Sequence, residues 1–293
     1  MIKKSRMSRR QFGQRSFLTA AAAAGATWFD LPRLLAGSRE DAWKKYGGFP
    51  MGLQSYSLRA FGVDGALEKT AALGLHYIEF FRAHYPTIPD PAKIAEMNAK
   101  LKKYDMTISS HGVQGFSKDH AANRKMFQFA KMAGIKNISA NPTPDSFDSL
   151  DRLVAEFDIR IAIHNHGPGA LYDQPVDAWK AVAGHDRRIG FCADLGHYIR
   201  SGIDPVEVTY LLGDRLYGVH LKDFAEQKKQ AEGVIIGKGH LDVEGVFRAL
   251  KKIGFPADGA LSLEYEENPN DPISDIQACL DVAAEAAQKV AAG

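Results

Sequence analysis

The sequence predicts an α/β fold, a (β/α)8 barrel, and three observations lead to this prediction. From residue 51 onward, short apolar runs typical of strands alternate with amphipathic helical patterns, which favours a parallel sheet built from βα units. Eight such units fit into residues 51–293, and barrels of this type usually have ~250 residues. Polar residues stand where several of the apolar runs end, as they do at the catalytic mouth of a barrel.

The predicted strands and helices follow one another along the chain. Strands are expected at residues 51–57, 77–81, 107–111, 137–140, 160–165, 190–194, 216–221 and 260–265. Helices are expected at residues 65–73, 91–104, 121–133, 146–156, 175–182, 205–212, 243–253 and 273–292. Start signals are expected at Asp64, Asp90 and Asp204, and stop signals at Gly74, Gly134 and Gly254. An open doubly wound sheet is the alternative fold, but no glycine-rich phosphate fingerprint follows the first strand.

The first 36 residues differ in kind from the rest. The sequence SRRQF at residues 8–12 is followed by an alanine-rich apolar run over residues 17–28, which is the pattern of a twin-arginine export signal. We therefore expect residues 1–36 to be a signal peptide and residues 37–293 to be a periplasmic barrel domain. A disordered basic arm, or an apolar helix docked on the domain, is the alternative. The apolar run is shorter than the ~20 residues of a stable membrane span.

Charge and cysteine content exclude other classes of protein. Residues 1–36 hold seven basic residues and one acidic residue, so their removal changes the formal net charge from +2 to −4. The remaining basic pairs, such as Lys102-Lys103, are scattered and form no stripe, which argues against nucleic acid as a partner. Cys192 and Cys279 are too few for a disulfide scaffold, although a single bridge between them stays open.

Four expected metal ligands lie at or near the ends of four consecutive predicted strands. They are His164, Asp194, His220 and Glu264. Taken alone, each would ordinarily be a buried polar residue with a hydrogen-bond partner. Together, two imidazoles and two carboxylates suit a divalent transition metal that keeps an open position for substrate oxygens.

Two further histidines are candidates for catalysis. His166 shares one face of its strand with His164, whereas Asn165 faces the other way. His197 follows Asp194 by three residues and is expected on a loop over the site, where it would bind a substrate hydroxyl or move a proton. A surface or capping histidine is the alternative for His197.

Other polar residues near the strand ends have two interpretations each. Lys222 is expected on the same face as His220, where it would neutralise a developing oxyanion, or pair with a nearby acid such as Asp223. Gln54, Glu79 and His111 are expected either to contact substrate or to be hydrogen-bonded inside the barrel.

These residues resemble the sugar phosphate isomerase/epimerase superfamily, the xylose isomerase-like TIM barrels, over residues 51–292. The resemblance is carried by DLGHY at residues 194–198, VHLKD at 219–223 and GHLDVEGVFRALKKIGFPADGALSLEYE at 239–266. It implies one Mn²⁺, Co²⁺, Zn²⁺ or Mg²⁺ ion and a small-molecule sugar or polyol as substrate. By position, Asp194, His220 and Glu264 look like three of the ligands and His197 like the substrate-contacting histidine.

One position departs from the family's epimerases. They usually place a glutamate where this chain has His164, and they use two carboxylates on opposite sides of the substrate. We expect a metal-dependent isomerase or epimerase that transfers an α-proton through an enediolate, with Glu264, His197, His166 and Lys222 as catalytic candidates. The missing carboxylate keeps open a lyase or dehydratase, of an inosose dehydratase-like or keto-glycoside-eliminating kind.

Two other functions and the state of assembly also stay open. A sugar-binding barrel without turnover would keep the fold and the metal. An endonuclease IV-like nuclease would need more metal ligands and a basic groove, and the charge of residues 37–293 argues against it. The sequence does not determine whether the chain forms oligomers.

Overall fold

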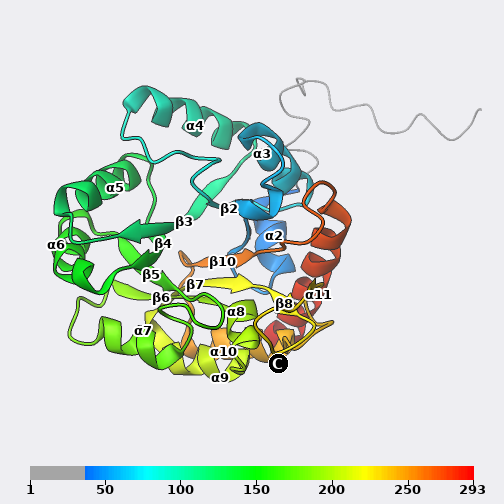
Figure 1. The fold of residues 1–293 in the computed structure, drawn as a ribbon. Helices are drawn as coiled ribbons and strands as arrows, with labels where there is room; N and C mark the ends of the chain where they lie inside the picture. Colours follow the sequence, from blue (N-terminus) through cyan, green and yellow to red (C-terminus); the bar gives the residue numbers. More distant parts are fainter. Residues whose placement is uncertain (1–36) are drawn as a thin grey trace, which may run out of the picture.

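The computed structural model describes residues 37–293, which form a closed barrel of eight parallel strands (Figure 1). The predicted fold class is confirmed, and the open sheet is excluded because β1 pairs with β10. Around the barrel the strands lie in the order β1-β10-β7-β6-β5-β4-β3-β2. Their bounds are β1 Met51–Gln54, β2 Tyr77–Phe80, β3 Thr107–Phe116, β4 Asn137–Pro142, β5 Arg160–His164, β6 Ile189–Asp194, β7 Leu216–Leu221 and β10 Ala260–Leu263. The expected signal at residues 1–36 lies outside the described residues.

Helices surround the barrel (Figure 1). They are α2 Arg39–Lys45, α3 Val63–Ala72, α4 Pro91–Lys103, α5 His120–Met132, α6 Phe147–Phe157, α7 Pro175–Val182, α8 Leu195–Arg200, α9 Pro205–Leu212, α10 Val243–Ile253 and α11 Ile273–Ala292. Short 3-10 helices lie at η1 Ser55–Leu58, η2 Pro144–Ser146 and η3 Gly213–Arg215. Within residues 37–293, no helix combines the length and the apolar character that a bilayer crossing requires.

Local capping explains where most helices begin and end. The Asp90 carboxylate accepts hydrogen bonds at the start of α4 and Asp204 does so at the start of α9, as predicted. The prediction for Asp64 was wrong, because α3 begins at Val63 and its N-cap is Gly62. The predicted stop signals are confirmed by positive φ angles at Gly74, Gly134 and Gly254, of 76°, 70° and 69°.

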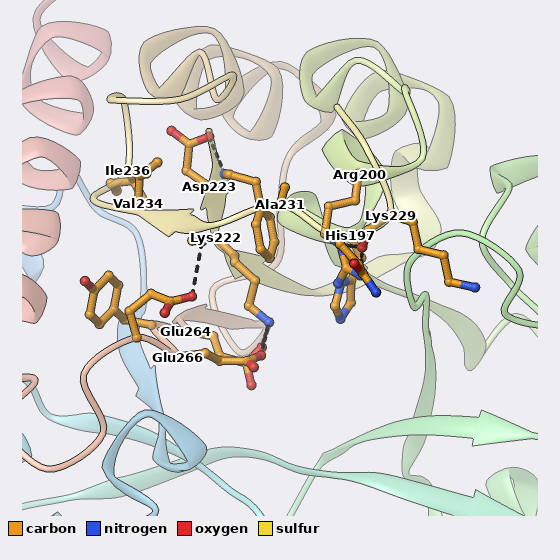
Figure 2. Close-up of a pocket in the computed structure, with 15 residues that line it drawn as sticks. His197, Arg200, Lys222, Asp223, Lys229, Ala231, Val234, Ile236, Glu264 and Glu266 are labelled. Carbon is orange, nitrogen blue, oxygen red and sulfur yellow. Dashed lines mark hydrogen bonds and ion pairs between the residues drawn. The ribbon is translucent and has the colours of Figure 1, made fainter. Parts of the chain in front are cut away.

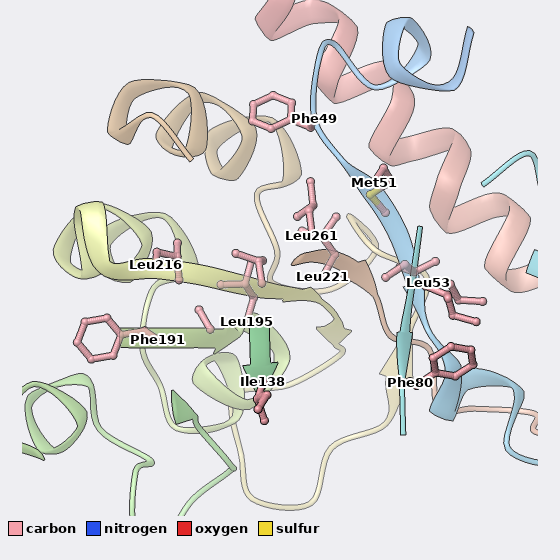
Figure 3. Packing of buried hydrophobic residues seen from close by; sticks show 14 of the residues in the cluster. Phe49, Met51, Leu53, Phe80, Ile138, Phe191, Leu195, Leu216, Leu221 and Leu261 are labelled. Atoms are coloured by element: carbon pink, nitrogen blue, oxygen red, sulfur yellow. The ribbon is translucent and has the colours of Figure 1, made fainter. Parts of the chain in front are cut away.

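The core lies between the barrel wall and the helices (Figure 3). Leu53, Ile138, Phe191, Leu221 and Leu261 are each at most 2% exposed and come from five different strands. Each such side chain contributes roughly 1.5–3 kcal/mol by leaving water. The two cysteines are free and buried, on β6 and α11, so the structure shows no bridge between them.

The register of the strands sets the level of the functional side chains. Asp194 of β6 pairs with His220 of β7, and His220 in turn pairs with Ser262 of β10. On the other side of β1, Gln54 pairs with Glu79 of β2. Parallel pairing therefore brings residues that are far apart in sequence to one end of the barrel.

Three features were not predicted from the sequence. Helix α2 precedes the barrel, helix α8 replaces the expected loop after β6, and a small hairpin of β8 (Asp223–Phe224) and β9 (Gly233–Val234) follows β7. In addition, β1 is shorter than expected, since the chain enters η1 directly after Gln54, whose side-chain oxygen accepts from the Tyr56 backbone N–H.

One buried carboxylate anchors the long connection between β7 and α10. Asp223 is only 2% exposed. Its oxygens accept hydrogen bonds from the backbone N–H groups of Gly237, Gly239, His240 and Leu241, at 2.8–3.0 Å. These bonds close the connection into a loop beside the barrel mouth, with the β8–β9 hairpin inside it.

Replacing this anchor should loosen the loop. In Asp223→Asn, an amide N–H₂ replaces one acceptor oxygen and faces backbone donors, which we expect to cost about 1–3 kcal/mol of unfolding free energy. Trypsin should then cut faster after Lys228 and Lys229, as followed by mass spectrometry. The matched control is Asp271→Asn at an exposed position. Unchanged stability and unchanged cleavage in Asp223→Asn would contradict the anchoring role.

Candidate metal centre and active site

The structure brings the four expected metal ligands together at the carboxyl end of the barrel. His164 ends β5, Asp194 ends β6, His220 lies on β7 and Glu264 directly follows β10. Each offers one ligand atom, and the four atoms lie within 4.8 Å of one another. All four residues are buried, and His164 and Glu264 also line a cavity at the barrel mouth.

The spacing of these atoms fits one divalent ion. His164 Nε2 lies 3.1 Å from His220 Nδ1 and 3.5 Å from Asp194 Oδ2. His220 Nδ1 lies 3.6 Å from Asp194 Oδ2 and 3.1 Å from Glu264 Oε2. Ligands bound at ~2.1 Å to one ion would be about 3.0–3.4 Å apart. Asp194 Oδ2 is also buried, and the Lys222 ammonium lies 3.0 Å from it, so this oxygen already lies beside a cation.

Glu79 holds the His220 ring in a ligand orientation. His220 Nε2 donates to Glu79 Oε2 at 3.0 Å, which leaves Nδ1 turned toward the other ligand atoms. Ser262 Oγ donates to the same carboxylate at 2.8 Å, and Ser139 Oγ donates to its other oxygen. Such a hydrogen bond fixes the tautomer of a ligating histidine. Glu79 is fully buried, so of its two expected roles the structure supports hydrogen bonding inside the barrel and not substrate contact.

Asp194 is held equally firmly. Its Oδ1 accepts the His197 backbone N–H at 2.8 Å and so caps helix α8, which leaves Oδ2 facing the other ligands. The Asn165 side chain bonds both backbone groups of Asp194, at 2.8 and 3.0 Å. Asn165 therefore faces away from the site and fastens β5 to β6, as the alternation along the strand predicts.

Lys222 lies among three carboxylates. Its Nζ is 2.6 Å from Glu264 Oε2 and 2.5 Å from Glu266 Oε1 (Figure 2). It is also 3.0 Å from Asp194 Oδ2. The side chain is 4% exposed. Burial alone would lower its pKa, but Asp194 and Glu264 raise the pKa well above its usual value, so Lys222 is a cation. Its partners are site carboxylates, and Asp223 instead anchors the loop.

The ligand carboxylates are ionised at neutral pH. Burial would raise the pKa of Glu264, but Lys222 and His220 together hold it well below the ordinary range. Burial would likewise raise the pKa of Asp194, but the Lys222 cation 3.0 Å away outweighs that effect and lowers it. Both groups are therefore anions, the form in which carboxylates bind metals.

Two histidines lie above the ligands. The centroid of the His166 ring lies 4.7 Å from that of His164 and 5.5 Å from that of His197, and the rings are tilted relative to one another. Burial lowers the pKa of His166 to about 4 and that of His197 to about 3, so both rings are neutral at pH 7. His197 lies on helix α8, and the expectation of a loop was wrong because Asp194 starts a helix at once.

Two adjoining cavities open at this end of the barrel. The proximal cavity, of about 370 Å³, is lined by Gln54, His164 and His166 together with Tyr56, Phe81, Arg82 and other residues. The distal cavity, of about 500 Å³, lies under the β8–β9 hairpin (Figure 2). Both cavities are lined by His197, Lys222, Glu264 and Glu266, so they adjoin each other at these four residues.

Of the residues expected to contact substrate, some line the proximal cavity and others do not. Gln54 lines the proximal cavity, in a position to meet a substrate. His111 does not line it: this fully buried ring bonds the Tyr85 carbonyl through Nε2 at 2.8 Å, and burial lowers its pKa to about 4. Sequence reasoning missed Glu266 and Arg82, although Glu266 stands two residues after Glu264 and so shares its face.

Comparison with known proteins identifies the family. A sequence model described as xylose isomerase-like TIM barrel matches residues 67–283. The chain belongs to this family. An inosose dehydratase of Clostridium botulinum is 28% identical over 139 residues, which are 42% of this chain and 46% of that enzyme. The match thus spans about half the length of that relative.

Solved structures show the same fold. An uncharacterised protein from Parabacteroides distasonis is 26% identical, with a TM-score of 0.63, over 82% of this chain and 98% of that one. The 3-keto-D-glucoside 4-epimerase of E. coli has a TM-score of 0.61 over 80% of this chain and 98% of that one. Its identity is 15%, so it supports the barrel and nothing finer.

The orienting role of Glu79 predicts a metal phenotype. In Glu79→Gln the charge that aligns His220 is lost while the side-chain shape stays, and we expect divalent-ion affinity to fall about 10–100-fold. Isothermal titration with Mn²⁺ or Zn²⁺ measures this change. The control is Glu96→Gln, since Glu96 is exposed on α4. Equal metal affinity in Glu79→Gln and the unmodified protein would contradict the role.

Proposed function

We propose that this protein is a metal-dependent sugar isomerase or epimerase that transfers an α-proton of a keto-sugar or related polyol through an enediolate. One observation carries the proposal: four N and O ligand atoms, one of them from the ionised Glu264, converge beside a cavity that also holds a lysine cation and two neutral histidines. Family membership supports the same class of chemistry.

His164, Asp194, His220 and Glu264 would hold the ion. Two imidazole nitrogens and two carboxylate oxygens favour Mn²⁺, Co²⁺ or Zn²⁺ over Mg²⁺, which prefers oxygen ligands. When bound, a divalent ion supplies a Lewis acid that polarises a substrate carbonyl.

The residues of the chain supply the proton transfer. Glu264 is anionic and lines the cavity, so it is our candidate to take the proton from the carbon next to the carbonyl. Lys222 Nζ, 2.6 Å from Glu264, would stabilise negative charge that develops on a substrate oxygen. His197 and His166 are neutral and would hold substrate hydroxyls and return a proton to carbon or oxygen.

A second candidate function is elimination, as in a dehydratase or lyase. Two observations favour it: an imidazole, His164, ends β5 where epimerases of the family usually carry a second carboxylate, and one relative in sequence is an inosose dehydratase. In this reaction the α-carbon–hydrogen bond breaks, its electron pair forms the new double bond, and the β-substituent departs with a proton. One carboxylate suffices for the first step.

Proton NMR in D₂O tests the proposal. The metal-loaded protein is incubated with ketoses, inososes and 3-keto-glycosides, and deuterium should appear at a carbon next to the carbonyl. An isomer or epimer as product supports the first candidate, and an unsaturated product or a released fragment supports elimination. No exchange across the panel, with metal bound, would reject α-proton transfer and favour a sugar-binding barrel.

Substitutions separate metal binding from proton transfer. Asp194→Ala and His220→Ala should lose the ion, because each removes a ligand and leaves buried charge unpaired. His197→Ala should keep the ion and lower kcat about 10²–10⁴-fold. Metal content is measured by elemental analysis and rates by the NMR assay, with His240→Ala as an exposed control. Full metal occupancy in both ligand variants would refute the assignment.

We also propose that residues 1–36 direct export to the periplasm by the twin-arginine route. The SRRQF sequence and the apolar run after it support this proposal. Changing Arg9-Arg10 to Lys-Lys should shift the protein from the periplasmic to the cytoplasmic fraction of a cell with this export system, as seen by immunoblot. Arg15→Lys is the control. An unaltered distribution in the double variant would argue for another role of the segment.

A further inference from the structure

We propose that the distal cavity is a subsite for a second, neutral sugar unit, so that the substrate is a keto-sugar that carries a glycosyl group. This inference rests on the proposed function for the proximal cavity. It adds the size and the chemical class of the substrate, which neither the ligand cluster nor the family determines.

The proximal and distal cavities adjoin each other at His197, Lys222, Glu264 and Glu266, which line both. Their volumes, about 370 and 500 Å³, each lie within the ~300–1,000 Å³ of small-molecule sites. A single sugar seated over the ligand atoms would leave the larger cavity to water alone.

The lining of the distal cavity is chemically mixed. Phe224, Val234 and Ile236 contribute apolar side chains, and Gln230, Glu266 and Glu267 contribute polar groups. A pyranose ring has the matching character, since its C–H face packs on apolar and aromatic side chains while its hydroxyls donate to carboxylates.

The charges that line the distal cavity nearly balance. The Arg200 guanidinium lies 5.2 Å above the Phe224 ring and donates from both Nε and Nη2 to the Lys229 carbonyl, which fixes its position and leaves its positive charge unchanged. Lys222 is paired with Glu264 and Glu266. The whole lining holds three cations, Arg200, Lys222 and Lys229, and four carboxylates, Asp223, Glu264, Glu266 and Glu267, which leaves a formal charge of −1. The cavity therefore offers a phosphate or carboxylate group no surplus of positive charge, and a neutral unit is favoured.

The position of the connecting bond follows from this arrangement. A molecule that fills both cavities crosses from one to the other beside His197 and the Lys222–Glu266 ion pair, whose atoms are 2.5 Å apart. The glycosidic linkage would lie next to this pair. In an elimination the distal unit would be the leaving group, and in an isomerisation it would stay attached.

Binding measurements test the subsite. Dissociation constants are measured by titration calorimetry on the Mn²⁺-loaded protein for fructose and for isomaltulose, turanose and maltulose, which carry a glucosyl group on fructose. We expect the best-bound of the three disaccharides to have a dissociation constant at least about ten-fold lower than that of fructose. Val234→Trp, which fills the distal cavity, should remove this preference and leave the affinity for fructose unchanged.

Two further variants serve as a control and as a replacement for Val234→Trp. Val176→Trp is the matched control, because Val176 is 53% exposed on α7, and Ala231→Trp is a second cavity-filling variant should Val234→Trp not fold. Three results would overturn the subsite: equal affinity for fructose and the disaccharides, binding of neither, or tighter binding of fructose 6-phosphate.

The experiments can reject the proposed subsite without rejecting the proposed function, and the reverse. A disaccharide preference that Val234→Trp abolishes, without deuterium exchange in any ketose, would keep the subsite and reject α-proton transfer. Exchange in fructose without any disaccharide preference would keep the proposed function and reject the subsite.

Discussion

Burial of opposite charges at the carboxyl end of the barrel is the constraint on which the site depends. Glu79, Asp194, Glu264, His220 and Lys222 are each at most 8% exposed. An isolated ion in such a place costs several kcal/mol, so these groups are tolerated only because each contacts an opposite charge. Each of these five charged side chains can therefore be buried only if the others are present. The strands of the barrel must place all five at the same height along its axis.

The barrel meets this requirement through strand register and short backbone anchors. Pairing of Asp194 with His220 sets two ligands side by side, and the N-cap bond from Asp194 to α8 fixes a carboxylate oxygen without involving solvent. The wall of the distal cavity is built differently, from a loop that depends on the Asp223 carboxylate. Thus the ligand cluster lies on rigid strands, whereas the part that would select the substrate lies on a loop, as in other barrels.

The sequence predicted an element well where its apolar periodicity was strong, and poorly where the element was short. Strand β7 and helices α7, α9, α10 and α11 lie within the predicted bounds because their apolar pattern is clear, and α9 and α10 also have side-chain N-caps, Asp204 and Asp242. Helix α8 has six residues, too few for a period, so His197 was expected on a loop. Substrate contact and hydrogen bonding inside the barrel were both expected for Glu79 and His111. Glu79 points into the barrel, where Ser139, His220 and Ser262 bond it, whereas His111 packs outside it against Phe129 of α5. Sequence periodicity does not show which face of a strand is the inner one.

Lys222 links the ligand cluster to the cavities. Its ammonium contacts Asp194 Oδ2 and Glu264 Oε2, the two oxygens that a divalent ion would also use. Two cations that share these oxygens repel each other, so an ion at the ligand atoms would weaken the hold of both carboxylates on Lys222. Its third partner, Glu266, is partly exposed and lies where the cavities meet, away from the ligand set. Metal occupancy and the charge that a substrate meets between the two cavities are therefore coupled through one side chain.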